Sequence, residues 1–167
     1  EILFGEHGFN VYPIVAHCVG AKPVKVPKKN LTFDVDATLA RVTNKTRIIF
    51  IANPNNPTGS YICEEELARL RAGLREDILL VIDCAYAEFV TSSDYNIGFD
   101  LVDGAENTVV TRTFSKIYAL ASLRIGWAYC PSSIADVLNR LRAPFNLSTA
   151  SQLAAKAAVE DVAHITT

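Results

Sequence analysis

The chain has 167 residues, half of them hydrophobic, and this is enough to bury the core of one domain. Its net charge of -2, without any long run of like charges, gives no electrostatic reason to expect binding to nucleic acid or to a membrane surface. Uncharged stretches such as 48–61 are interrupted by Pro and Asn and fall short of the roughly 20 apolar residues that span a bilayer, so we expect a soluble protein with a small ligand.

Short β-rich runs alternate with helical patterns, which is typical of a layered α/β fold with crossover helices. In chain order we predict strand 2–4, helix 11–19, strand 23–26, helix 36–42, strand 47–52, helix 64–74, strand 79–83, strand 108–113, strand 125–130, helix 133–141 and helix 148–162. Segments 48–51 and 79–82 are apolar at consecutive positions, as expected for strands covered on both faces. We therefore predict a mostly parallel sheet with helices on both faces, in three αβα layers.

Local signals refine this prediction. Ser133 is the expected N-cap of helix 133–141, and segment 92–103 is the expected surface loop. No internal repeat or Gly/Ser linker divides the chain. We expect one domain.

The four cysteines lie far apart in sequence, without a C-x-x-C pair or a histidine spaced to complete a zinc site. We expect no metal, and a reducing cytoplasm is the simplest setting. The chain opens directly in an apolar segment, contains no methionine and closes on a predicted helix. These ends lead us to expect a fragment of a longer protein.

The first segment with chemical potential is Asn53-Pro-Asn-Asn-Pro-Thr-Gly59, which directly follows an apolar strand. Open α/β sheets bind ligands at the carboxyl ends of their strands, so this position favours a binding loop. Asn, Pro and Gly are also ordinary turn formers, and the segment alone is equally compatible with a surface turn.

The second segment begins at Asp83, which ends a predicted buried strand and is followed by Tyr86 and Glu88. A carboxylate there can pair with a protonated heterocyclic nitrogen, and a phenol can hydrogen-bond a cofactor oxygen. An Asp at a strand end also commonly caps a turn.

The third segment follows the predicted strand 108–113. Thr113, Ser115 and Arg124 are suited to binding a phosphate through hydroxyls and a planar guanidinium. Lys116, if partly desolvated, is suited to act as a nucleophile or base. The alternative is that Lys116 and Arg124 are solvated surface charges.

Taken together and in order, NPNNPTG, DCAYAEF and RTFSKIYALASLRIGWAY resemble the fold-type-I aminotransferases that depend on pyridoxal 5'-phosphate (PLP). GEHGFNVY and LRAPFNLSTASQLAAKAA make the chain look most similar to the histidinol-phosphate aminotransferase family within them. This resemblance covers essentially the whole chain. It implies transamination between L-histidinol phosphate and 2-oxoglutarate in histidine biosynthesis.

The resemblance assigns a role to each matching residue. Lys116 matches the catalytic lysine, which holds PLP as a Schiff base and later shuttles a proton. Asp83 matches the carboxylate that keeps the pyridine nitrogen protonated, and Asn56 and Tyr86 match the partners of the ring's phenolic oxygen.

The other cofactor contacts implied by the resemblance involve the phosphate and the ring face. Thr113, Ser115 and Arg124 match residues that grip the phosphate, and Phe9 matches an aromatic ring stacked on the pyridine. A lone Phe is more often a core residue. Cys84 departs from the family, which commonly has an acidic residue there.

The resemblance also implies what lies outside residues 1–167. The chain matches part of the large PLP-binding domain, without the N-terminal arm or the C-terminal small domain, and the parent would be a homodimer. Shared motifs leave open an aromatic aminotransferase or an amino-acid phosphate decarboxylase, and also an inactive fragment that keeps only the fold. A Rossmann domain is disfavoured, because neither G-x-G-x-x-G nor a P-loop lysine motif occurs.

Overall fold

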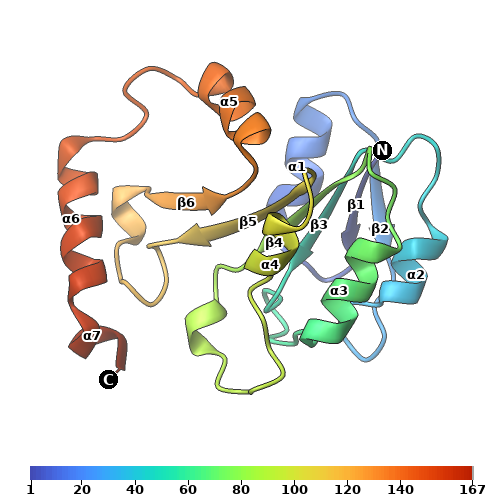
Figure 1. The fold of residues 1–167 in the computed structure, drawn as a ribbon, viewed down its shortest axis with the longest axis horizontal. Helices are drawn as coiled ribbons and strands as arrows, with labels where there is room; N and C mark the ends of the chain where they lie inside the picture. Colours follow the sequence, from blue (N-terminus) through green and yellow to red (C-terminus); the bar gives the residue numbers. More distant parts are fainter. Residues whose placement is uncertain (167) are drawn as a thin grey trace.

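The computed structural model describes residues 1–166 and contains one sheet with strand order β2-β1-β3-β4-β5-β6 (Figure 1). All neighbouring strands run parallel except β5 and β6, which pair antiparallel. The strands are β1 (Ile2–Gly5), β2 (Pro23–Val26), β3 (Ile48–Ala52), β4 (Leu79–Asp83), β5 (Thr108–Thr113) and β6 (Gly126–Tyr129). The predicted strands and the mostly parallel sheet are confirmed, with bounds that agree to within one residue.

Helices cover both faces of the sheet. On β3, the side chain of Ile51 belongs to the core cluster that contains Leu67 of α3 (Glu64–Ala72). The ring of Phe50, the preceding residue on β3, stacks on Tyr12 of α1 (Val11–Cys18) with 4.8 Å between centroids. Because neighbouring strand residues point to opposite faces, α1 and α3 lie on opposite sides of the sheet. The three-layer α/β architecture is thus present (Figure 1).

The two faces are not equally buried. Ile49 and Ile51 are fully buried on the side of α2 (Val35–Ala40) and α3, and they anchor the main core. Ile48 and Phe50, on the opposite side, are only half-buried. The prediction of strands covered on both faces therefore holds fully for one face, because the eight-residue helix α1 covers only part of the other.

The segment predicted as a surface loop, 92–103, contains the short helix α4 (Phe99–Asp103). It follows Gly98, whose φ of 91° is available mainly to glycine, and Asn96 accepts a hydrogen bond from the Gly98 amide through its side chain. The buried side chain of Val102 fixes the helix against the sheet. Tertiary burial thus stabilises a helix that is too short to be recognised from periodicity.

The C-terminal part forms a second, smaller cluster around Phe114, Ile125 and Ala155. Helix α5 (Ser132–Leu141) has Pro131 at its N-cap position without a side-chain cap, so the prediction that Ser133 caps this helix is wrong. Helix α6 (Thr149–Glu160) is capped by Ser148, which accepts a hydrogen bond from the amide of Ser151. A short helix, α7 (Val162–Thr166), follows.

Within residues 1–166 no helix has the length and apolarity needed to cross a membrane.

Candidate active site

The loop after β3 is held by its buried first residue. The side chain of Asn53 accepts a hydrogen bond from the Ile62 amide (2.9 Å) and donates one to the Ile62 carbonyl (3.2 Å). The Tyr95 hydroxyl donates to the Asn53 carbonyl at 2.7 Å. These bonds close the NPNNPTG loop at its base, so the loop is held in place at the carboxyl end of β3.

A second buried amide joins this loop to the turn after β1. The Asn55 Nδ2 atom donates to the His7 carbonyl at 3.1 Å and to the Thr58 hydroxyl at 2.7 Å. The loop is thereby tied to the segment that carries Phe9. Within residues 1–166 the side chain of Asn56, the next residue, makes no such bond, and it contributes to the lining of a pocket at the strand ends.

Asp83 ends β4 and holds two hydrogen bonds. Its Oδ2 atom accepts from the Tyr12 hydroxyl at 2.8 Å, and its Oδ1 atom accepts from the Ala85 amide at 3.2 Å. Burial raises the pKa of the Asp83 carboxyl, while these two hydrogen bonds and the charge of Lys116 act in the opposite direction. Asp83 therefore caps a turn and also presents a carboxylate to the pocket.

Tyr12 is a site residue that the sequence motifs left without a role. Its ring is buried between Phe4 and Phe50, and its hydroxyl points to Asp83, 71 residues away in sequence. Burial raises the pKa of the Tyr12 phenol, and the neighbouring Asp83 carboxylate raises it further. The phenol therefore stays protonated at neutral pH and can donate its hydrogen bond to Asp83. The signal in the sequence that could have identified Tyr12 as a site residue was its place in the GEHGFNVY segment.

Five of the predicted site residues line the same pocket, namely Phe9, Asn56, Asp83, Tyr86 and Lys116. The Lys116 Nζ atom lies 4.8 Å from the centroid of the Tyr86 ring, within cation–π range. The Phe9 ring meets Tyr12 edge-on, with 5.8 Å between centroids. The pocket brings an amine, a phenol, an amide and a carboxylate together.

Lys116 differs from the expectation in one respect. Its suitability as a nucleophile or base was tied to partial desolvation, but Lys116 is exposed although it lines the pocket. The structure gives Lys116 a pocket position and a neighbouring phenol, without burial.

The three residues predicted to bind phosphate do not line this pocket among the described residues. The Thr113 hydroxyl accepts a hydrogen bond from the Ser115 amide at 3.0 Å, which shapes the turn before Lys116. The exposed Arg124 has a left-handed backbone (φ 49°) and donates to the Ala121 carbonyl of its own turn. Thr113 and Ser115 thus border Lys116, while the Arg124 guanidinium stays on its turn.

No group of three or more His, Cys, Asp or Glu side chains that would suit a metal ion occurs within the described residues. The chemistry of the site therefore depends on the amine, phenol, amide and carboxylate of the pocket.

Comparison with known proteins adds independent information. Residues 1–166 match the family model described as aminotransferase class I and II. Histidinol-phosphate aminotransferase of Rhodospirillum centenum is 58% identical over 162 residues, which are 97% of this chain and 45% of that protein. The enzyme of the same name from Paramagnetospirillum magneticum is 56% identical over 164 residues, covering 98% of this chain and 45% of that protein.

Among solved structures, the histidinol-phosphate aminotransferase of Sinorhizobium meliloti in complex with pyridoxal-5'-phosphate superposes with a TM-score of 0.93 at 29% identity. The match covers 99% of this chain and 45% of that one. The chain thus spans a little under half the length of the curated relatives it matches.

Proposed function

Because the chain belongs to the class I and II aminotransferases, we propose that it is the cofactor-binding part of a PLP-dependent histidinol-phosphate aminotransferase. The complete enzyme transfers an amino group between L-histidinol phosphate with 2-oxoglutarate and imidazole-acetol phosphate with glutamate. Relatives of that name at 58% and 56% identity support this activity over the alternative enzymes. The observation that carries the proposal is the pocket shared by Asn56, Asp83, Tyr86 and Lys116.

The residues present fit PLP, which has a pyridine nitrogen, a phenolic oxygen, an aldehyde and a phosphate. The pocket offers the Asp83 carboxylate for the nitrogen and the Lys116 amine for the aldehyde. Asn56 and Tyr86 offer an amide and a phenol for the phenolic oxygen. Phe9 supplies an aromatic face. For the phosphate we propose Thr113, Ser115 and Arg124, with Arg124 turning away from its carbonyl partner.

In the mechanism, bound PLP supplies a ring that accepts electrons from the substrate Cα. Lys116 would hold the cofactor through its Nζ atom, and the free Lys116 amine would be the base that takes the substrate's Cα proton. Asp83 must be ionised to keep a proton on the pyridine nitrogen. The hydrogen bonds from Tyr12 and the Ala85 amide favour that ionised form against the effect of burial.

Three broader features belong to the same proposal. Residues 1–167 form part of the large domain, and the N-terminal arm and the small domain come from the rest of the enzyme. The complete enzyme is a homodimer in the cytoplasm. The cysteines Cys18, Cys63, Cys84 and Cys130 are free thiols, which suits a reducing compartment.

The first test is the full-length protein incubated with PLP, followed by borohydride reduction and peptide mapping. We expect the pyridoxyl group on Lys116 and its loss in Lys116→Ala. Lys156→Ala, which removes an exposed lysine on α6, should leave the label unchanged. A label that is absent or scattered over surface lysines would refute the PLP site.

The second test is a product assay with the same protein. We expect imidazole-acetol phosphate and glutamate from L-histidinol phosphate and 2-oxoglutarate. Release of CO2 from an amino-acid phosphate, or a preference for aromatic amino acids, would leave the PLP site intact and overturn the proposed substrate.

A further inference from the structure

Glu88 and Arg112 form an ion pair, and their side chains are only 13% and 10% exposed. Every other ion pair within the described residues includes at least one well-exposed side chain. Exposed pairs contribute little because water competes for both charges, whereas a buried pair leaves an uncompensated charge when one partner is removed. This pair therefore constrains the geometry around it more strongly than the others do.

The position of the pair in the chain links it to the pocket. Glu88 lies on the 3-10 turn Ala87–Phe89, directly after Tyr86. Arg112 lies on β5, four residues before Lys116. The ion pair thus joins the segment that carries the pocket phenol to the segment that carries the pocket amine.

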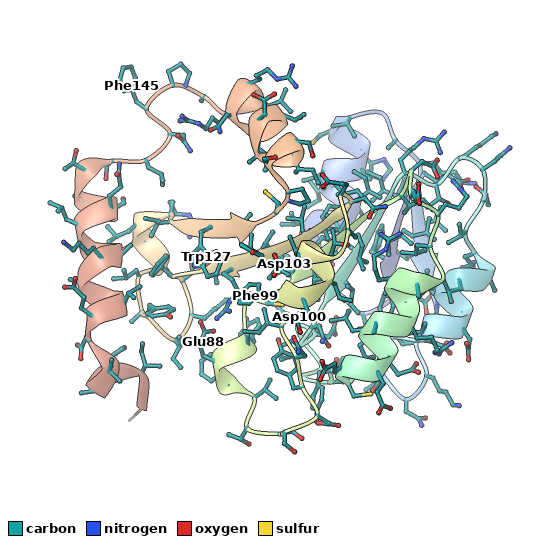
Figure 2. All side chains as sticks on the ribbon, viewed as in Figure 1. Glu88, Phe99, Asp100, Asp103, Trp127 and Phe145 are labelled. Atoms are coloured by element: carbon teal, nitrogen blue, oxygen red, sulfur yellow. The ribbon has the colours of Figure 1, made fainter. Side chains whose placement is uncertain are left out.

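Aromatic packing fixes the orientation of the Arg112 side chain. Arg112 is paired with Trp127 across β5 and β6, and its guanidinium carbon lies 5.6 Å from the centroid of the Trp127 ring. Trp127 in turn stacks on Phe99 of α4 at 6.1 Å. Figure 2 labels Glu88, Phe99 and Trp127, which come from three different elements: Glu88 and Trp127 contact the Arg112 guanidinium, and Phe99 packs on Trp127.

Glu88 also acts on the other side of Lys116. Burial raises the pKa of the Tyr118 phenol, and the charge of the neighbouring Glu88 carboxylate raises it further, while the charge of Arg112 acts in the opposite direction. Tyr118 follows Lys116 by two residues and packs on Phe114 with 4.9 Å between ring centroids. The charge of one carboxylate therefore acts on residues on both sides of the exposed lysine.

We propose that the Glu88–Arg112 pair is a positioning device that sets the Lys116 amine against the Tyr86 phenol. Neither residue lines the pocket, so neither is assigned contact with cofactor or substrate. Because the Lys116 side chain is exposed, its position depends on the backbone on either side of it, and Glu88 holds the strand that leads into Lys116 through its ion pair with Arg112. This inference rests on the proposed function, since it concerns the same lysine.

The test uses the full-length holoenzyme with Glu88→Gln, which keeps the shape of the side chain and removes its charge. We expect kcat to fall about 10- to 100-fold, as for a small misplacement of a reacting group, with KM changed much less. The absorbance of lysine-bound PLP should titrate at a shifted pH, because the amine has a new environment. Borohydride should still label Lys116. The control Glu66→Gln breaks an exposed pair with Arg69 on α3 and should change none of these quantities.

A double-mutant cycle separates positioning from general stability. In Glu88→Gln/Arg112→Gln the loss in kcat should equal that of the worse single variant, because the two residues act as one unit. Multiplied losses would show independent roles and overturn the proposal. So would a lowered melting temperature of Glu88→Gln with unchanged kcat and unchanged pH titration.

Two conservative variants keep the proposal testable if Glu88→Gln does not fold. Glu88→Asp keeps the charge on a shorter side chain, and Arg112→Lys keeps the charge without the planar fork. Both should give intermediate losses in kcat, with the absorbance of lysine-bound PLP again titrating at a shifted pH, and wild-type values for both would overturn the proposal. If the wild-type enzyme itself carries no PLP on Lys116, the proposed function fails first, and the two failures are thereby distinguished.

Discussion

Replacing Tyr12 by Phe isolates one hydrogen bond in the candidate site. The Tyr12 ring is stacked on Phe50 at 4.8 Å with an interplanar angle of 8°, and a Phe ring fills the same space. The substitution removes the hydroxyl that donates to Asp83 at 2.8 Å. A hydrogen bond to a charged group contributes about 1.5–3 kcal/mol, so the free energy of unfolding at pH 7 should fall by about that amount.

The pH dependence gives the sign of the effect. Burial raises the pKa of Asp83 above its ordinary value, and the Tyr12 hydrogen bond counteracts this by favouring the carboxylate. Its removal therefore raises that pKa further. A carboxyl with a raised pKa in the folded state favours folding below its unfolded-state value, and this contribution is lost as the pH rises through the folded-state pKa. The Tyr12→Phe deficit should therefore be largest at neutral pH and shrink towards pH 4.

The assay is thermal and urea unfolding of the full-length apoprotein at pH 7 and pH 4. Tyr61→Phe is the matched control, because the Tyr61 hydroxyl also donates to a carboxylate at 2.8 Å, that of the exposed Asp94. Water can replace the lost donor there, so the control should lose much less stability. Equal losses for the two variants, or a Tyr12→Phe loss that is the same at both pH values, would refute this account of Asp83.

Three further outcomes are expected. Asn53→Ala removes both side-chain hydrogen bonds at the base of the NPNNPTG loop and should cost about 2–5 kcal/mol, measured by urea unfolding, with a loop cleaved faster by protease. Gly126→Ala should lower the melting temperature by several degrees, because the added Cβ would lie 2.6 Å from the Arg112 carbonyl oxygen, and an unchanged value would contradict this contact. Burial raises the pKa of Cys84 to about 12, so a thiol reagent at pH 8 should modify the exposed Cys18 quickly and Cys84 only after unfolding, as mass spectrometry would show.

Much of the fold could be predicted from the sequence because the sheet is built from local apolar runs. The strands around Ile49, Leu80 and Val110 are short, β-rich and bounded by turn residues, and their predicted limits agree with the structure. Helix α4 could not be predicted, because its five residues are too few for a helical period and its formation depends on burial of Val102. Ser133 is a good cap by residue type, but the helix begins one residue earlier, after Pro131.

The site divides in the same way. Sequence alone determined the residue types and their order: an amide-rich loop, then Asp83 and Tyr86, then Lys116, each at the end of a strand. Parallel strands bring their carboxyl ends to one edge of a sheet, so these side chains had to be neighbours once the strand order was known.

Only the tertiary structure decided the partners of those residues. Tyr12 meets Asp83 across 71 residues, and Glu88 meets Arg112 across 24. Such contacts depend on helix packing and strand register, which no local pattern encodes. The types and order of the reactive groups are therefore a property of the chain, whereas the side chains that hold each group in place are a property of the fold.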